Sequence, residues 1–456
     1  MAITTPNIVA STTTSDQQKF IAAKLLQRSQ LKLVCSSICM KVDHPTGHGN
    51  QATFIRYNRM NVPLTSLTEG TDPSQSTISL ASVTVTMDQW GDVLALSDIS
   101  QLETMHPLFQ QATELLADNA QRVIDREVQI VWMAGTNVQY GDGSVTSRST
   151  VTSSMKLSDT VIQKARISLV DGGAPPRNGP ESGYSVADAN KAASINGPDH
   201  YVAVAGPQVL GDIQVSSASF GSWAAVSTYK DAMRTYNAEV GTWLGIRWVE
   251  TNFIPKFTML GNTTTAVASG NAFGTDTPVV SVLNGASGAL SNSTTYRFKV
   301  TRKKKDRGFE EAISIEHSMA TGASDDAFTF NFSGLTAGYV YNVYFGSSTG
   351  DANLKLAHSN VEVGTTVTVN EVPTSTTTAP ANVNTTGTPT IHPVFIHGAR
   401  SCAWVGLQQL KTFVSGDQAT TDNPLLLRKT VGYKFMGKAV ILDQNFMLRL
   451  EVASTY

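Results

Sequence analysis

The stretch HYVAVAGP, residues His200–Pro207, is the part of the sequence that decides the fold. Its apolar run is short, alternates valine with alanine and is ended by Gly206-Pro207, which is typical of a buried β-strand. Over residues 155–260, helical patterns such as Val161–Leu169 alternate with strand patterns of this kind. The alternation predicts a mixed α/β domain in this part of the chain.

The clearest helix in the sequence precedes this domain and covers residues 107–134. Pro107 suits the first helical position, where its missing N–H is not needed, and Gly135 is placed to cap the carboxyl end. A helix of this length would run roughly 42 Å, long enough to act as a spine. The apolar residues that follow helical spacing are Leu108, Ala112, Leu115, Leu116, Ala120, Val123, Ile124, Val128 and Val131.

Residues 50–97 read as extended chain. Ile78 and Leu80 alternate with polar neighbours, and Val83, Val85 and Met87 then do so in the opposite phase. Such a change of phase predicts a bulge or a bend within a long β-loop. Before this loop, residues 1–19 form a polar, Thr-rich arm that needs a partner to become ordered, and residues 20–34 are predicted to be helical.

Composition changes sharply at residues 262–390, where Thr, Ser, Gly and Asn dominate and helical periodicity disappears. The even spacing of short strand patterns predicts a β-sandwich. Linker-like segments flank it and α/β character returns at Ile391, so the sandwich is predicted to be an insertion within another domain. The seven predicted strands cover residues 278–283, 295–302, 312–317, 327–332, 339–346, 354–358 and 365–370.

The last stretch of the chain is predicted to be a hairpin. Val440–Leu442 leads into a turn at Asp443–Asn445, and Phe446, Leu448, Leu450 and Val452 then alternate with Met447, Arg449 and Glu451. This alternation is typical of a strand with one buried face.

Charge and cysteine content narrow the classes of function. The 456 residues carry a net charge of −2 and only 15% are charged, so no global basic field exists to hold nucleic acid or a membrane surface. The three cysteines, Cys35, Cys39 and Cys402, are too few for a disulfide framework and are predicted to be structural thiols in a reducing compartment. The first residues resemble no secretory signal, so we expect synthesis and folding in the cytoplasm.

Sequence motifs for catalysis fail on their context, so no enzyme activity, cofactor or metal is predicted. Gly432–Ala439 resembles a phosphate-binding loop, but Ala439 stands where Ser or Thr is needed and the segment reads as strand. Gly346–Gly350 has nucleophile-elbow spacing, but it leads into another strand. His44 with His48, and His392 with His397, lack a third ligand at metal-binding spacing.

Two separated segments resemble the Hong Kong 97-type family of tailed-phage major capsid proteins. After Pro207, the first contains EVGTWLGIRWVET, residues Glu239–Thr251, which matches the family's Gly-x-x-x-Gly-x-Arg-x-x-Glu segment. The second is NPLLLRKTVGYK, residues Asn423–Lys434, before the final hairpin. The matching positions are Pro207, Gly241, Gly245, Arg247, Glu250, Pro424 and Gly432.

The resemblance implies an α+β capsid fold with an inserted all-β domain and a subunit that self-assembles into an icosahedral shell. Implied partners are further copies in hexamers and pentamers, portal, scaffolding and cement proteins, and packaged DNA through non-specific contact. Implied parts are an N-terminal arm (1–49), an extended β-loop (50–97), the spine helix with the first part of the axial domain (98–261), the insert (262–390) and the closing part (391–456). The implied location is the virion, after assembly in the bacterial cytoplasm.

The insert carries its own resemblance. GLTAGYVYNV, residues Gly334–Val343, is similar to the Gly-Leu-x-x-Gly-x-x-Tyr-x-Val of fibronectin type III and related immunoglobulin-like domains. Tyr341 would be the tyrosine-corner residue, with its hydroxyl bonded back to the backbone. Such modules on phage capsids imply an outward-facing decoration that binds surface carbohydrate.

Two alternative functions stay open at the level of sequence. A capsid-like nanocompartment would enclose an enzyme cargo with a related shell. A secreted or surface adhesin, or a carbohydrate-binding protein, would use the fibronectin-like module but needs a secretion route.

Overall fold

A computed structural model describes most of the chain. The predicted arm at 1–19, most of the predicted helix at 20–34, and Pro107 and Pro424 lie outside the described residues. The residues that it describes are 33–58, 77–97, 108–177, 200–216, 224–225, 236–257, 266–272, 276–284, 290–312, 314–322, 325–379, 389–414 and 427–456, with Met60, Val62, Ser66, Glu69 and Leu425.

The chain divides into two compact units, and the described part of the first contains Cys39–Val128 and Cys402–Leu442. Its four-stranded sheet has the order β1-β20-β21-β4, with β1 parallel to β20 and the other pairs antiparallel. The sequence analysis assigned residues 88–97 to the extended β-loop. They form β4 instead, a strand of this sheet that pairs with β21. The strands are β1 (Met40–Asp43), β4 (Asp88–Ser97), β20 (Cys402–Val414) and β21 (Arg428–Ile441).

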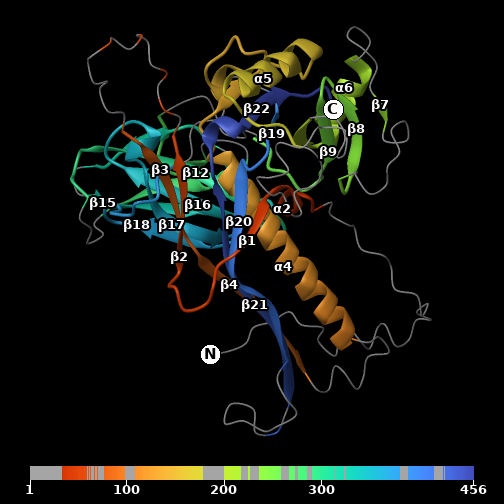
Figure 1. Ribbon diagram of the computed structural model, residues 1–456. Coiled ribbons are helices and arrows are strands. Elements are labelled where there is room, and N and C mark those ends of the chain that lie inside the picture. Colours follow the sequence, from red (N-terminus) through yellow and green to blue (C-terminus); the bar gives the residue numbers. More distant parts are fainter. Residues whose placement is uncertain are drawn as a thin grey trace. The chain divides into compact units, whose positions relative to one another are not determined.

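The long helix α4 (Leu108–Met133) confirms the predicted spine to within one residue at each end. Its apolar face, including Leu116 and Ala120, packs against Val431, Tyr433 and Phe435 of β21. Figure 1 shows α4 running alongside β20 and β21. At 1.5 Å per residue its 26 residues extend roughly 39 Å, so the helix stiffens the first unit along one face of the sheet.

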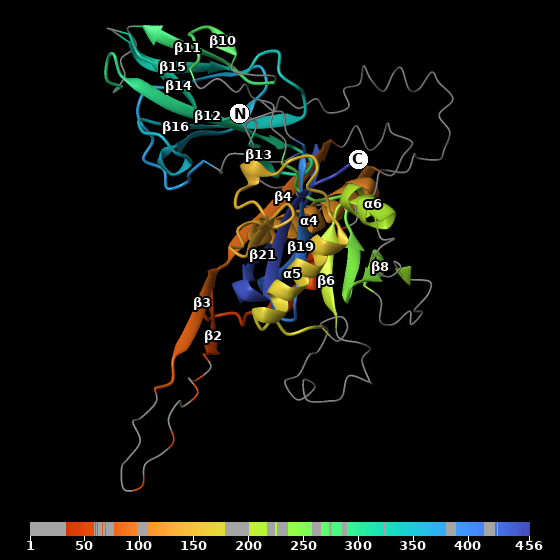
Figure 2. The ribbon, with the colours of Figure 1, turned by 90° about the horizontal axis from the view of Figure 1, so that it is seen from above.

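An antiparallel ribbon of two strands, β2 (Gln51–Tyr57) and β3 (Leu80–Thr86), belongs to the same unit. The two strands pair from Gln51↔Thr86 to Tyr57↔Leu80 without a register shift, so the predicted bulge is wrong. The change of phase instead marks apolar side chains on both faces of one regular strand. Figure 2 shows β2 and β3 side by side and projecting beyond β21.

The second unit is built on a seven-stranded sheet of order β5-β22-β19-β6-β9-β8-β7. Helices α5 (Asp159–Asp171) and α6 (Pro207–Ser216) pack on one face, and Trp132 lies 5.3 Å from Phe395 between ring centroids on the other. Every residue of β6, β19 and β22 is buried, because both faces are covered. The strands are β5 (Val138–Tyr140), β6 (Tyr201–Ala205), β7 (Ala224–Ala225), β8 (Glu239–Trp243), β9 (Ile246–Glu250), β19 (Ile391–His397) and β22 (Met447–Ala453).

The predicted hairpin at the end of the chain is wrong. β21 ends at Ile441 and pairs with β20 and β4, whereas β22 pairs with β19 and β5 in the other sheet. The predicted alternation of buried and exposed residues is also wrong, because all seven residues of β22 are buried. A strand with two covered faces cannot show a polar side.

Burial of Arg449 and Glu451 on β22 is made possible by an ion cluster. The Glu451 carboxylate accepts two hydrogen bonds from Arg148, at 2.6 and 2.7 Å, and lies 3.0 Å from Nε of Arg449. The guanidinium of Arg148 in turn stacks over the ring of Phe257 at 3.6 Å. Two cations on one buried carboxylate, both hydrogen-bonded or in contact, satisfy a charge that would otherwise be costly inside the sheet.

Two further sheets, within residues 271–369, enclose a single aromatic core. One has the order β10-β11-β15-β18 and the other β13-β12-β16-β17, with β14 also paired to β12. Phe298, Phe328, Phe330, Tyr341 and Phe345 come from both sheets and are buried in this core. The strands are β10 (Asn271–Ala272), β11 (Val279–Asn284), β12 (Thr295–Lys304), β13 (Glu310–Ala312), β14 (His317–Ala320), β15 (Asp325–Asn331), β16 (Tyr339–Gly346), β17 (Lys355–Glu362) and β18 (Thr366–Val369).

Six of the seven predicted strands in this region correspond to single strands, while the one predicted at 312–317 is divided. β13 ends at Ala312, opposite Thr301, and β14 begins at His317, opposite Phe298. The chain enters and leaves the region at neighbouring points, since Phe257 and Ile391 exchange two backbone hydrogen bonds of 3.0 Å. The remaining short elements are α2 (Cys35–Ile38), η1 (Arg148–Thr150), η4 (Asp351–Asn353) and η5 (Gln444–Phe446).

His392, one of the two buried histidines of β19, predicts acid sensitivity. Burial, aided by the Lys256 cation, lowers the pKa of His392 to about 4. Between pH ~6.5 and ~4 the unfolded chain therefore binds a proton that the folded chain does not, so stability is full above pH ~6.5 and falls with pH, by up to about 3 kcal/mol. We expect His392→Gln to reduce the slope of the melting temperature against pH in this window. Equal slopes in variant and wild type would contradict the assignment.

Candidate functional site

The base of the β2–β3 ribbon is anchored in the apolar core of the first unit. Val85, Met87 and Val405 are buried there, and Ala52 and Phe54 of β2 pack against them. Because the anchor uses side chains from β2, β3 and β20, the ribbon leaves the sheet at a fixed place. The other members of the cluster are Val42, Leu407, Met436 and Val440.

Beyond this base the ribbon exposes large apolar side chains, which we call the ribbon patch. Its members are 58–77% exposed. An isolated two-stranded ribbon is only marginally stable in water, so leaving these apolar side chains uncovered is unfavourable. Ribbon edges also present unpaired backbone groups that can pair with another chain. The ribbon patch therefore has the chemistry of a surface that another protein covers. Its members are Ile55, Tyr57, Met60, Val62, Ile78 and Leu80.

A second exposed apolar group, the sheet-end patch, lies where β4, β20 and β21 meet the residues before Arg428. It consists of Val93, Leu410, Phe413, Leu425 and Leu427. β20 changes along its length from buried residues near Cys402 to exposed residues near Phe413. This end of the sheet thus offers a further apolar contact surface in the first unit.

Gly432 faces Val93 in the sheet that bears the sheet-end patch. A Cβ at Gly432 would come within 2.9 Å of Val93 Cγ2 and 3.1 Å of the Asp92 carbonyl oxygen. The close approach of β4 to β21 requires glycine here, so this motif position has a packing role.

The motif segment at residues 239–251 forms the hairpin of β8 and β9. Leu244 and Gly245 both have positive φ, 52° and 72°, as a two-residue type I′ turn requires. Arg247 is buried, lies 3.7 Å from the Glu239 carboxylate and stacks 6.0 Å from the ring of Tyr236. The Glu239 carboxylate also accepts the backbone N–H of Tyr236 at 2.9 Å, so these groups hold the start of the hairpin together.

Other motif positions lie along the same strands and at the end of β6. Gly241 sits at the register shift between β8 and β9, and Glu250 ends β9 opposite Ala205. Pro207 follows β6 as the first residue of α6, where proline costs no hydrogen bond. The structure therefore places Gly245 at one end of the paired strands β6 and β9, and Glu250 and Pro207 at the opposite end, with Gly241 and Arg247 on the hairpin between them. Gly432 belongs to the other unit.

Tyr341, the predicted tyrosine-corner residue, is fully buried near the start of β16. Its hydroxyl donates to the Asp276 carboxylate at 3.2 Å, where the sequence predicted a backbone acceptor. The same carboxylate accepts from Arg302 at 2.8 Å and from the backbone N–H of Thr336 at 2.7 Å. Burial opposes its charge, but these hydrogen bonds outweigh burial and hold the pKa of Asp276 below its ordinary value. The cluster ties the loop before β11 to β12 and β16.

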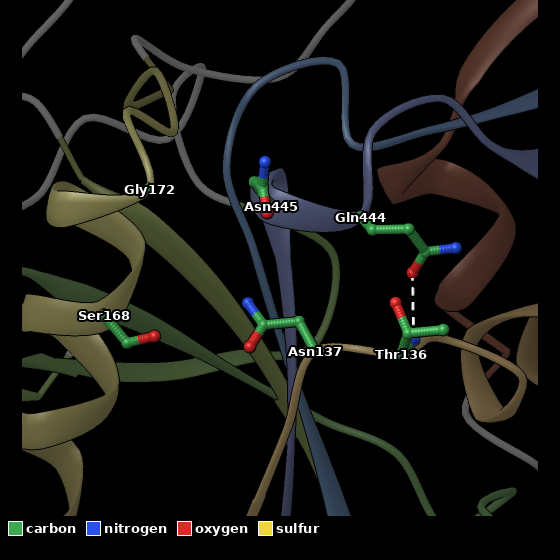
Figure 3. A pocket seen from close by; sticks show the side chains of 6 residues that line it. All are labelled: Thr136, Asn137, Ser168, Gly172, Gln444 and Asn445. Atoms are coloured by element: carbon green, nitrogen blue, oxygen red, sulfur yellow. Dashed lines mark hydrogen bonds between the residues drawn. The ribbon is translucent and has the colours of Figure 1, made fainter.

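A polar cavity of about 310 Å³ opens in the second unit (Figure 3). One contact across it joins the backbone N–H of Thr136 to Oε1 of Gln444 at 3.0 Å. The lining offers hydroxyl and amide groups but no acid, base or thiol for proton transfer or nucleophilic attack. The lining residues are Thr136, Asn137, Ser168, Gly172, Gln444 and Asn445.

The segments that imitate catalytic motifs have the contexts predicted from the sequence. Gly432–Ala439 lies within β21 and opens into no helix. Gly346–Gly350 leads from β16 through η4 into β17. Within the described residues, the helices are too short or too polar to cross a membrane.

Comparison with solved structures decides the fold. The capsid of Ralstonia phage GP4 superposes with a TM-score of 0.51 at 10% identity, over 100% of this chain and 98% of that one. The chain has the fold of tailed-phage capsid proteins. This confirms the α+β capsid fold predicted from the sequence. The capsid of cyanophage Pam1 is similar at a TM-score of 0.49 and 10% identity, and the match covers 96% of this chain and 97% of that one. The capsid of cyanophage P-SCSP1u is similar at a TM-score of 0.48 and 11% identity, and the match covers 96% of this chain and 93% of that one.

The sequence matches no family model and no curated protein. The capsid fold is therefore assigned from the three-dimensional arrangement of the chain.

Several important residues were missed by sequence reasoning. The ribbon patch was not recognised, although isoleucine and leucine at alternating positions of a polar segment were its visible signal. Asp276 and Glu239 were not identified as partners of Tyr341 and Arg247, because they lie 65 and 8 positions away and no local pattern links them.

Removal of one hydroxyl tests the role of Tyr341. Tyr341→Phe keeps the buried ring but removes a hydrogen bond to a charged carboxylate, which should cost about 1.5–3 kcal/mol. Chemical denaturation of the protein, followed by a signal from this domain, measures the loss. The matched control is Tyr339→Phe, on the neighbouring half-exposed position. A cost at Tyr341 no greater than at Tyr339 would contradict the assignment.

Proposed function

We propose that this chain is the major capsid protein of a tailed phage, a subunit that self-assembles into an icosahedral shell enclosing DNA. The observation that carries the proposal is the ribbon patch, displayed on an anchored two-stranded ribbon within a capsid fold. Such a ribbon gains its full stability only when a neighbouring subunit covers it. The role is structural and requires no catalytic group.

The energetics of the ribbon patch fit repeated weak contacts. Burial of one large apolar side chain contributes about 1.5–3 kcal/mol, so six contribute on the order of 10 kcal/mol before the cost of association. The sheet-end patch would add to this total. A closed shell repeats the same contact by symmetry, so modest contacts produce a stable particle.

Contact with packaged DNA would be weak and independent of sequence. The net charge of −2 gives the subunit no overall attraction for a polyanion. Weak attraction suits a container that must not fix its contents in place. An adhesin is not favoured, because the structural match extends over the whole chain.

We further propose that residues 262–390 form an inserted immunoglobulin-like domain that decorates the outside of the shell. The sheet containing β10, β11 and β15 and the sheet containing β12, β16 and β17 follow the A-B-E and C-F-G arrangement of such domains. Tyr341 lies near the start of β16, which corresponds to strand F. Surface carbohydrate as its ligand stays a prediction from the resemblance.

Assembly of ribbon-patch variants tests the shell proposal. A triple variant, Ile55→Ser, Tyr57→Ser and Ile78→Ser, removes apolar area that is already exposed in the subunit. The subunit should therefore keep its melting temperature. The concentration needed for particle formation, measured by light scattering and negative-stain microscopy, should rise at least ten-fold, because every 1.4 kcal/mol lost is ten-fold.

The control for this experiment is Leu283→Ser, which removes an exposed apolar side chain on β11 instead. It should assemble like the wild type. Particles formed equally well by the triple variant, or a wild-type protein that stays a monomer at high concentration, would overturn the proposal.

Deletion of residues 262–390 tests the insertion. Phe257 and Ile391 are already hydrogen-bonded, and residues 258–261 would join them as a four-residue loop of ordinary hairpin length. We expect the shortened chain to fold, with the circular dichroism and melting temperature of the second unit's sheet preserved. A chain that no longer folds would mean that the sandwich is integral to the main domain.

A further inference from the structure

Two cysteines from distant parts of the chain face each other in the first unit. Cys39 immediately precedes β1, and Cys402 is the first residue of β20. Their Sγ atoms are 2.8 Å apart, although 363 positions separate them in the sequence. Both side chains are buried, at 3% and 0% exposure.

The backbone around the pair suits a covalent bond. β1 and β20 run parallel, with Met40 opposite Ala403, so Cys39 and Cys402 occupy the preceding positions of the same ladder. Neighbouring strands lie about 4.8 Å apart, within the 4.4–6.8 Å that a disulfide requires between Cα atoms. A disulfide of about 2.05 Å would need the sulfurs to approach by less than about 1 Å.

We propose that Cys39 and Cys402 form an intramolecular disulfide when the protein meets an oxidising medium containing a low-molecular-weight disulfide. The Cys39 thiol, the more exposed of the two, loses its proton and attacks one sulfur of the reagent, releasing one reduced thiolate. The Cys402 thiolate then attacks the Cys39 sulfur and displaces the second. Two protein thiols are oxidised, one reagent disulfide is reduced to two thiols, and both protons pass to the leaving thiolates.

The disulfide would link the segment just before the ribbon covalently to β20. β1 is followed in sequence by β2, so the disulfide ties the segment that leads into the ribbon to β20, which supplies Val405 of the ribbon's anchor. Closing a loop of this length restricts the unfolded chain strongly.

Cys35 supplies an internal reference for the same experiment. Its Sγ lies 3.0 Å from Nε2 of Gln129, which donates to it, and the side chain is buried. It is only four positions from Cys39, so a nonspecific oxidation would pair these two neighbours instead. The geometry assigns the bond to Cys39 and Cys402 and leaves Cys35 as a thiol.

The test is oxidation of the native full-length protein with excess glutathione disulfide, followed by denaturation, alkylation in the denaturant and peptide mapping without reductant. We expect one alkylated thiol per chain, at Cys35, in place of three, and a linked peptide pair containing Cys39 and Cys402. The melting temperature of the oxidised protein should rise by several degrees and return after reduction.

Two variants complete the design. Cys35→Ala should keep both the linked peptides and the redox-dependent shift in melting temperature. Cys402→Ala should lose both. Three alkylated thiols after oxidation of the wild type, a link that involves Cys35, or a link between two chains would overturn the proposal, and peptide mapping of the wild type gives this answer even if a variant fails to fold.

Discussion

A two-stranded ribbon cannot cover its own apolar side chains, and this constraint governs the first unit. Within the described residues β2 and β3 pair only with each other, so both edges and, beyond the anchored base, both faces meet solvent. β2 and β3 nevertheless carry isoleucine, leucine and tyrosine on exposed positions, while their base is locked by Val85, Met87 and Val405. A firmly anchored strand pair with an uncovered apolar end makes sense if the missing half of its core belongs to another subunit.

The rest of the chain can be understood as support for this geometry. α4 packs along β21 and stiffens the sheet from which the ribbon departs. The second unit meets its burial requirement internally, with helices on one face of its sheet and Trp132 on the other. The insert likewise has its own aromatic core, and its two ends meet at Phe257 and Ile391, so it can be added without disturbing the sheet that carries it.

Much of the fold could be predicted from local periodicity, because periodicity depends only on neighbours in the sequence. The spine helix, the strand before Pro207 and the strand at 339–346 could all be predicted from spacing and end signals. The prediction failed where partners come from distant segments. β22 shows no alternation of buried and exposed residues because both of its faces are covered. The bulge in β3 was wrongly predicted because apolar side chains lie on both faces of a regular strand. The proximity of Cys39 and Cys402 cannot be predicted from the spacing of the cysteines in the sequence.

Hydrogen–deuterium exchange of the β2 and β3 amides, in unassembled subunits and in assembled particles, tests the central claim most directly. A marginal ribbon opens readily when alone, so its amides should exchange quickly in the subunit and at least ten-fold more slowly in the particle. Amides of β21 beside α4 should exchange slowly in both. Equal exchange of the ribbon amides in subunits and particles would contradict the account, because the ribbon would then gain nothing from its neighbours.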